Sequence, residues 1–291
     1  MTVPVEVSLV LQRARRVCTP CGQGDLVWHV WGEQGADPAL PPLLLLHGGS
    51  GSWTHWLLNV MPLAATGRRV LVPDLPGFGD SALPPSGTDV DAMPAPLEQG
   101  LAQLLGDTAC DLAGFSFGGM TAGLLAGEFP ARVARLVLIG APGMGLKALV
   151  PFKLKAWRHL PGEAQRLAVH RDNLQLLMLH APEAITPLAC QLQSANAVRD
   201  RLPKRRLSNT NILARTMPGL RCPVHAVYGE HDPLYKGQIQ AYENALQQAP
   251  GFRGMHAIAA AGHWAQFEQA DAFNRLLLAL LDTHQGAICG G

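Results

Sequence analysis

Five residues, Gly114-Phe115-Ser116-Phe117-Gly118, form a G-x-S-x-G pattern that suits nucleophilic chemistry. A short apolar run, 109–113, precedes the pattern, and small residues of helical character, 120–127, follow it. A serine on a sharp turn between strand and helix presents its Oγ above the sheet, and the flanking glycines let the two backbones approach. The first N–H groups of the helix then face a developing oxyanion. The pattern predicts Ser116 as a nucleophile, and a glycine-rich turn with an incidental serine is the alternative.

A serine nucleophile needs a base, and the base needs an acid that orients it. When the serine lies on a strand-to-helix turn of this kind, the expected chain order is serine, acid, histidine, with each residue on a loop after a strand. Asp232 follows the apolar run 224–228, and His263 follows the predicted strand 255–259. Both would project from the same sheet edge as Ser116. We therefore expect Ser116, His263 and Asp232 to form a triad. Glu230 is the alternative acid, and the Asp-Pro step after position 231 favours Asp232 because it suits a tight turn.

Two backbone N–H groups are expected to stabilise the oxyanion. One belongs to Phe117, directly after the nucleophile, and the other to Gly49, where small residues allow close approach. Ser50 and Ser52 are alternative nucleophiles, but no strand-to-helix turn presents them. His47 is interpreted as a structural histidine of this loop rather than as a base.

The elements that position these residues alternate between strands and helices. Strands are expected at 5–16, 25–31, 42–46, 69–73, 109–113, 135–140, 224–229 and 255–259, and helices near 55–63, 97–105, 120–127, 237–248 and 270–281. The first two strands alternate apolar and polar residues and predict a hairpin, whereas the central ones are continuously apolar, as buried parallel strands are. The fold class is therefore α/β, with a mostly parallel sheet covered by helices on both faces.

Residues 144–217 interrupt this alternation, because they look helical throughout. We interpret them as a helical cap inserted into a core formed by 1–143 and 218–291. The cap range carries a formal charge of +8 and the remainder −7. Such a charge difference fits a solvated basic surface docked on an acidic body, or a cap that draws anionic substrates toward a cleft. The run Pro203-Lys204-Arg205-Arg206 is too short to indicate nuclear targeting.

Composition excludes several classes of protein. With 291 residues, 48% hydrophobic and only 15% charged, the chain has ample material for a packed core and lacks the composition of a disordered protein. A net charge of +1 gives no reason to expect nucleic acid or an acidic membrane surface as partner. No secretory signal opens the sequence, and its apolar runs are too short to span a bilayer. We expect a cytoplasmic protein with a small-molecule substrate and no membrane partner; a homo-oligomer is left open.

The cysteines give little support to redox or metal chemistry. Of six, only Cys18-Thr19-Pro20-Cys21 has metal or redox spacing, and no second pair or histidine cluster completes a zinc site. We interpret Cys18 and Cys21 as two reduced thiols and expect neither a metal nor a cofactor.

Together these motifs resemble an α/β-hydrolase-fold serine hydrolase. The resemblance rests on the loops 47–49, 74–81, 229–233 and 262–263 and on the G-x-S-x-G turn, and it covers nearly the whole chain outside the cap. Within that superfamily, residues 262–268 and 270–274 are similar to the meta-cleavage product hydrolases, which split a carbon–carbon bond in vinylogous diketone acids from aromatic catabolism. The tryptophan that follows the histidine in that family is matched by Trp264.

The sequence also departs from that narrower family. Phe115 stands where the family commonly has asparagine, and Gln193 aligns with its carboxylate-binding cap arginine. Residues 115–119 are closer to bacterial esterases and cofactor-free perhydrolases. Serine rather than aspartate at position 116 disfavours a haloalkane dehalogenase or an epoxide hydrolase.

The resemblance implies a cofactor-free hydrolase that attacks a small carbonyl substrate. A carboxylic ester is the first expectation, carbon–carbon cleavage of a diketone acid is the alternative, and a non-catalytic binding member of the fold is the third. Substrate contacts are expected from Ser50, Phe115, Arg199 and Trp264. Arg199 is nominated as the cation for a substrate carboxylate, because glutamine at position 193 supplies no charge.

Overall fold

A single sheet of eight strands forms the centre of the computed structural model, which describes residues 3–147, 149, 153–202 and 204–282. The strands are β1 (Arg15–Cys21), β2 (Gly24–Trp31), β3 (Leu43–Leu46), β4 (Val70–Pro73), β5 (Cys110–Phe115), β6 (Val133–Ile139), β7 (Val224–Gly229) and β8 (Phe252–Ile258). Their spatial order is β1-β2-β4-β3-β5-β6-β7-β8. The pairs β1–β2 and β2–β4 are antiparallel, and all others are parallel. The predicted mostly parallel sheet is confirmed.

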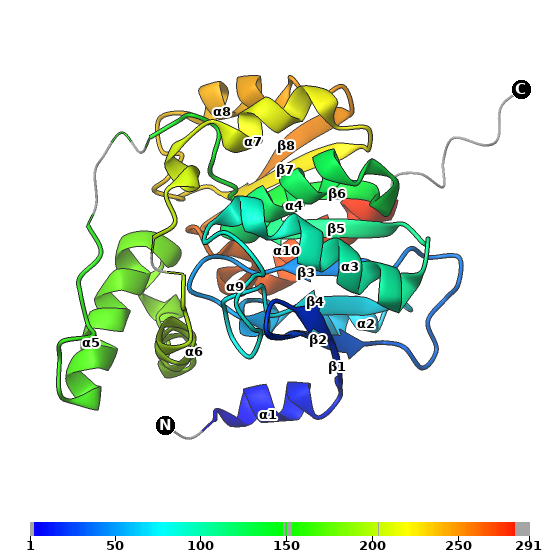
Figure 1. Cartoon of the computed structure of the whole chain (residues 1–291). Coiled ribbons are helices and arrows are strands. Elements are labelled where there is room, and N and C mark those ends of the chain that lie inside the picture. The colour runs from blue at the N-terminus through cyan, green and yellow to red at the C-terminus, as the bar shows by residue number, and fades with distance from the viewer. Residues whose placement is uncertain (1–2, 148, 150–152, 203, 283–291) are drawn as a thin grey trace, which may run out of the picture.

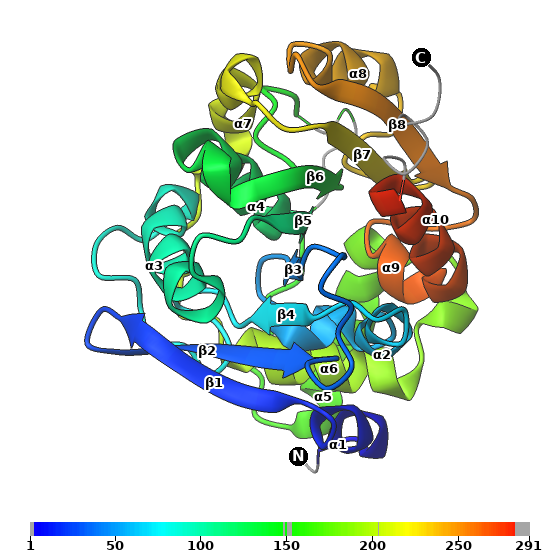
Figure 2. The same cartoon turned by 90° about the vertical axis from the view of Figure 1, so that its right-hand side faces the viewer.

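Helices cover both faces of this sheet. They are α1 (Val5–Leu11), α2 (Val60–Ala64), α3 (Pro94–Leu105), α4 (Phe117–Glu128), α5 (Glu163–Asn173), α6 (Pro187–Val198), α7 (Ile212–Thr216), α8 (Ile239–Leu246), α9 (Ala265–Glu268) and α10 (Ala270–Asp282). In Figure 2, α3 and α4 lie on one side of the sheet and α2 and α10 on the other. Successive side chains of β3 point to opposite faces of the sheet. Leu44 and Leu46 therefore pack in the core under α4, whereas Leu43 and Leu45 pack in the core under α10.

The N-terminal segment differs from its prediction. A strand was expected at 5–16, but residues Val5–Leu11 form α1, and the strand begins at Arg15. The register explains the difference: Arg15 pairs with Val30, and β2 ends one residue later, so earlier residues have no strand opposite them. Their backbone groups are satisfied within a helix instead. A hairpin is present as predicted, but its first strand is Arg15–Cys21 and not 5–16.

Two smaller predictions also meet the structure. The helix expected near 55–63 is split into a 3-10 turn, Trp53–Trp56, and α2. Cys18 and Cys21 both lie in β1 as free thiols, the first exposed and the second buried. Burial raises the pKa of Cys21 to about 11, so it stays a neutral thiol at pH 7.

Between β6 and β7 the described residues contain helices and no strand. Helices α5 and α6 stand to one side of the sheet (Figure 1), joined by a π-helical turn, Leu174–Met178, and a short connection. Helix α7 also lies in the predicted cap range, yet Leu213 packs in the same core as α4. The division into a cap at 144–217 and a core at 1–143 and 218–291 remains a proposal.

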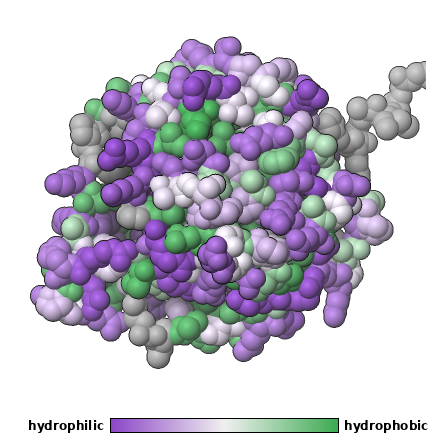
Figure 3. Space-filling view, in the orientation of Figure 1, coloured by the Kyte–Doolittle hydropathy of each residue, from purple (hydrophilic) through white to green (hydrophobic). Residues whose placement is uncertain are grey.

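The polarity of the surface and the character of the helices bear on membrane association. Hydrophilic residues predominate on the face shown in Figure 3, with hydrophobic ones scattered among them. No helix in the described part of the chain combines the length and apolar character that crossing a membrane requires.

Candidate active site

Ser116 occupies the turn between β5 and α4 that the sequence predicts. Its backbone lies at φ 53° and ψ −116°, a conformation that a residue with a Cβ rarely adopts. The turn is held on both sides, because the Ser116 N–H donates to the Ile139 carbonyl at 2.7 Å and the Ser116 carbonyl accepts from Gly119 N–H at 2.8 Å. A Cβ on Gly114 would collide with the backbone oxygen of Gly118. The close strand–helix approach therefore requires glycine there.

Asp232 and His263 meet beside this turn. Their strands, β7 and β8, run parallel to β5, so the loops that follow all three lie at one edge of the sheet. The His263 Nδ1 and Asp232 Oδ2 atoms are 2.6 Å apart, and both residues are buried to 2% relative exposure. The second carboxylate oxygen of Asp232 accepts from the Leu234 N–H at 2.9 Å. When Nδ1 carries the proton and donates a hydrogen bond to the carboxylate, Nε2 of His263 is unprotonated and can act as a base.

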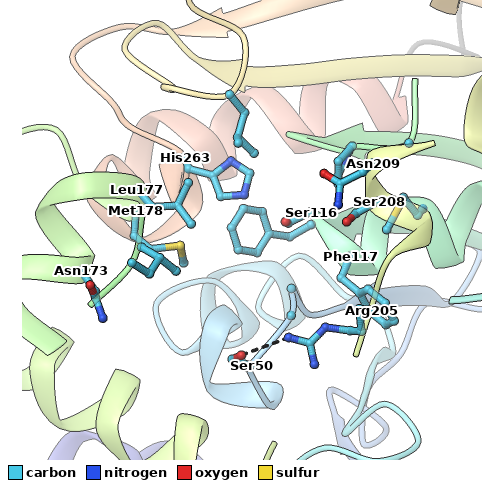
Figure 4. A pocket seen from close by; sticks show the side chains of 18 of the residues that line it. Ser50, Ser116, Phe117, Asn173, Leu177, Met178, Arg205, Ser208, Asn209 and His263 are labelled. Carbon is cyan, nitrogen blue, oxygen red and sulfur yellow. Dashed lines mark hydrogen bonds between the residues drawn. The ribbon is translucent and has the colours of Figure 1, made fainter. Parts of the chain in front are cut away.

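Ser116 and His263 share one cavity of about 630 Å³. Figure 4 shows Ser116 near its centre, with His263 above and Leu177 and Met178 on one wall. The Phe115 ring lies 4.9 Å from the imidazole of His263, centroid to centroid, and lines the same space. The structure thus brings the three predicted triad residues to one buried site that opens into a cavity of substrate size.

Both expected oxyanion donors border this cavity. Gly49 and Phe117 both line it, and Phe117 directly follows Ser116 in the chain. Neither backbone N–H donates to another residue in the described part of the chain. Such unpaired donors beside a serine nucleophile can hold a developing oxyanion without reorganisation.

Two neutral imidazoles hold the loop that carries Gly49. His47 Nε2 accepts from the Leu75 N–H at 2.8 Å, and His55 Nδ1 accepts from the Gly48 N–H at 3.2 Å. Complete burial lowers the pKa of His47 and lowers that of His55 far more. Both rings therefore stay uncharged and keep the lone pairs that these bonds need. His47 anchors the loop, as its interpretation from the sequence required.

Of the alternative catalytic residues, Ser50 borders the cavity, where its Oγ donates to Asp200 Oδ2 at 2.5 Å, whereas Glu230 and Ser52 lie elsewhere. Glu230 is exposed, and its Oε2 accepts from the Ala260 N–H at 3.2 Å. Ser52 is buried in hydrogen bonds to Thr54 and Asn196 at 2.9 and 2.7 Å. Neither contributes to the cavity lining.

With this geometry established, comparison with known proteins identifies the family. The model of the alpha/beta hydrolase family matches residues 43–276, which is most of the chain. The chain belongs to the alpha/beta hydrolase family.

Two curated relatives are 29% and 30% identical to this hydrolase. It is 29% identical over 265 residues to the 2-hydroxy-6-oxo-6-phenylhexa-2,4-dienoate hydrolase of Burkholderia cepacia, with 82% of this chain and 87% of the relative covered. It is 30% identical over 266 residues, with the same coverage, to a 2-hydroxy-6-oxononadienedioate/2-hydroxy-6-oxononatrienedioate hydrolase of Comamonas testosteroni.

Solved structures support the fold of the hydrolase. Carboxylesterase CesB of Bacillus subtilis superposes with a TM-score of 0.73 at 20% identity, covering 96% of this chain and 95% of that one. The meta-cleavage product hydrolase CumD of Pseudomonas fluorescens IP01 superposes with a TM-score of 0.68 at 21% identity, covering 89% and 95%. Because identity is low, these likenesses establish architecture alone.

Of the four predicted substrate contacts of the hydrolase, two line the cavity and two do not. Ser50 and Phe115 line the cavity. Trp264 does not: it is fully buried and donates from Nε1 to the His55 carbonyl at 3.0 Å. Through this bond Trp264 supports His55, whose imidazole holds the loop that carries Gly49.

Arg199 is not brought to the cavity either. Its Nη2 lies 3.5 Å from Asp74 Oδ2 and 3.1 Å from Asp80 Oδ1, on the loop after β4. Those two carboxylates hold the guanidinium away from Ser116, so Arg199 joins the end of α6 to the core rather than facing a substrate.

Three cations that were not predicted as site residues line the cavity, Lys147, Lys155 and Arg205, and Arg205 is the one beside Gly49. It lines the cavity next to Gly49, where a Cβ would lie 3.4 Å from Arg205 Nη2. Arg205 Nη1 donates to the two carboxylate oxygens of Asp200 at 2.8 and 2.9 Å, and Arg205 Nη2 donates to Ser50 Oγ at 3.2 Å. The guanidinium also lies 5.6 Å from the centre of the Phe117 ring. The signals in the sequence were the formal charge of +8 in 144–217 and the basic run 204–206.

Proposed function

We propose that this protein is a serine hydrolase that cleaves a small carboxylic ester through an acyl-enzyme. Ser116 is the nucleophile, His263 the base and Asp232 the acid that orients the base. One observation carries the proposal: a buried histidine–aspartate contact of 2.6 Å lies at the sheet edge where a strained serine turn opens into the same cavity. A serine, a base and an orienting acid in this order are the parts that acyl transfer needs.

The mechanism follows from the positions of the polar atoms. His263 Nε2 takes the proton from Ser116 Oγ while that oxygen attacks the carbonyl carbon, and the carbonyl oxygen becomes an oxyanion held by the N–H groups of Gly49 and Phe117. Collapse of the adduct breaks the bond to the alkoxy oxygen, which leaves as an alcohol with the proton from His263. Water then attacks the acyl-enzyme with His263 as base again, releasing the acid and restoring Ser116.

The cavity lining favours a substrate that carries a negative charge. Lys147, Lys155 and Arg205 line it, and no described aspartate or glutamate does. Both Lys155 and Arg205 are paired with an acid, Asp172 and Asp200 respectively, but Arg205 is the cation that lies beside the oxyanion donor Gly49. A carboxylate that leaves water requires a partner of opposite charge, and a guanidinium edge binds it through two donors. We propose an acid-bearing ester with Arg205 as its carboxylate partner.

Carbon–carbon cleavage of a vinylogous diketone acid is the second candidate. It is favoured by the names of the two curated relatives, both dienoate-type hydrolases, and by the cationic cavity, since such an acid carries a carboxylate. The same serine, histidine and oxyanion donors would act after ketonisation of the substrate. Phe115 is the residue that distinguishes the candidates, because it places an apolar ring against His263 where the family commonly has asparagine.

One substrate panel with a labelling control tests the proposal. Purified protein is assayed on neutral p-nitrophenyl esters, on the p-nitrophenyl half-ester of a dicarboxylic acid and on a dienoate diketone acid, and a fluorophosphonate is used to label the nucleophile. We expect labelling at Ser116 and preferred turnover of the half-ester. Preference for the diketone acid would establish the second candidate. Absence of both labelling and turnover would leave a binding member of the fold.

A further inference from the structure

The loop that carries His263 is tied on both sides to a segment from the predicted cap. The Trp264 N–H donates to the Met178 carbonyl at 2.7 Å, directly after the histidine. Directly before it, Gly262 runs so close to this segment that an added Cβ would lie 2.8 Å from the His180 nitrogen. Met178 itself lines the cavity beside His263 (Figure 4). The wall of the cavity and the loop of the base are therefore in direct contact.

Glu268 joins the same two segments through its carboxylate. It ends α9, five residues after His263. Oε1 accepts from the N–H groups of His180 and Ala181 at 2.9 and 2.6 Å, and Oε2 accepts from those of Gly262 and His180 at 2.7 and 3.0 Å. Three backbone donors from two distant parts of the chain thus converge on one anion.

A carboxylate suits this position better than any neutral side chain. All three of its partners are donors, and an ionised carboxylate accepts at both oxygens. A glutamine would keep the shape but turn an N–H₂ group toward one of the backbone N–H groups. Hydrogen bonds to a charged acceptor are also stronger than neutral ones, so the connection resists displacement.

We propose that Glu268 is a positioning residue that holds the His263 loop in register with the Met178–Ala181 wall of the cavity. This inference rests on the proposed function, in which His263 is the base. The carboxylate touches neither substrate nor reacting atoms. It acts by fixing the backbone on both sides of the contact between wall and base. A small misplacement of the base is costly, because proton transfer depends on the geometry of the attacking serine.

Glu268→Gln tests the proposal, with Glu230→Gln as matched control. Glu230 is also a carboxylate near the His263 loop, but it is exposed and accepts a single backbone N–H. Two rates are measured for each protein: turnover of the best substrate from the panel, and phosphonylation of Ser116 by a small fluorophosphonate. The second reaction needs the base but not the cavity wall. We expect Glu268→Gln to lower both kcat and the labelling rate ~10-fold or more with KM unchanged, and Glu230→Gln to leave both within about 2-fold.

The outcomes separate this inference from the proposed function. Wild-type protein that is not labelled at Ser116 would overturn both. Labelled wild type with a folded Glu268→Gln variant of normal kcat and labelling rate would overturn the inference alone, even if the variant melted at a lower temperature. A rise in KM with kcat intact would assign Glu268 to the substrate wall and also overturn it.

Ala181→Pro decides the matter if Glu268→Gln does not fold. Ala181 lies at φ −78° and ψ 128°, which proline adopts without strain. The change replaces the N–H that donates to Glu268 Oε1 at 2.6 Å with a ring carbon, so the carboxylate loses this donor and must move away from position 181. We expect kcat and labelling to fall together by about 3-fold. Equal rates in this variant and the wild type would overturn the proposal.

Discussion

Two polar clusters border the cavity, and they are built in opposite ways. Ser116, Asp232 and His263 come from the ends of three neighbouring parallel strands, where the sheet itself fixes their separation. Ser50, Asp200 and Arg205 come from a core loop and from the irregular segment after α6, and ionic hydrogen bonds hold them together. We propose that this difference separates two tasks, with the sheet edge supplying the reaction chemistry and the cluster of Ser50, Asp200 and Arg205 supplying selectivity.

Removing the nucleophile from the sheet-edge cluster should have the largest effect. Ser116→Ala is expected to lower kcat by about 10⁶-fold on every substrate, since only binding and oxyanion terms remain. Turnover and fluorophosphonate labelling are measured together, with circular dichroism to verify the fold. A folded variant that retains a tenth of the wild-type rate would remove Ser116 from the mechanism.

Breaking the acid of the same cluster should be the next largest change. Asp232→Asn is expected to lower kcat about 10⁴-fold, because the amide donates to Nδ1 and leaves the wrong tautomer of His263. KM should change little. Glu230→Gln is the comparison, and a larger loss there than at Asp232 would move the orienting acid to Glu230.

Changing the second cluster should alter selectivity instead of chemistry. Arg205→Ala is expected to lower kcat/KM for an acid-bearing substrate ~10-fold or more while sparing a neutral ester, the scale of a lost charge-assisted hydrogen bond of about 1.5–3 kcal/mol. The measured quantity is the ratio of kcat/KM between the two substrates.

Arg206→Ala is the matched control for that ratio, since Arg206 is the exposed neighbour of Arg205. Arg199→Ala is assayed beside it, and equal effects on both substrates are expected because Asp74 and Asp80 hold that side chain outside the cavity. A ratio that changes with Arg199 and not with Arg205 would exchange their roles.

The smallest and most graded effect is expected from acid acting on the loop of Gly49, which His47 and His55 hold beside both clusters. His47 and His55 have folded pKa values below the ordinary histidine value of about 6.5, so the unfolded chain binds more protons and stability falls as pH drops below that value. Tm is measured against pH for wild type and His55→Asn. The variant should show the shallower slope, and parallel curves would exclude His55 as a source of acid sensitivity.

The sequence predicted the sheet-edge cluster because its determinants are local. Glycines at 114 and 118, an apolar strand and a small-residue helix specify the turn of Ser116, and the chain order then specifies Asp232 and His263. The position of Arg205 depends on contacts with residues more than 100 positions away, such as Ser50. No periodicity marks such an irregular segment, so Arg199 was chosen instead. Similarly, the alternation of apolar and polar residues at 5–11 is compatible with a strand. The structure has a helix there because β2 ends at Trp31 and leaves no strand for those residues to pair with.

The pairing of Arg205 with Asp200 has a consequence for product release. Hydrolysis of an ester or of a carbon–carbon bond leaves a new carboxylate in a cavity whose described lining holds cations and no acid. An isolated guanidinium would retain that anion and slow the next cycle. Because Asp200 already neutralises much of the charge on Arg205 at 2.8 and 2.9 Å, the departing acid competes with a resident one. Weak inhibition by its own acid product is the kinetic behaviour that this arrangement favours.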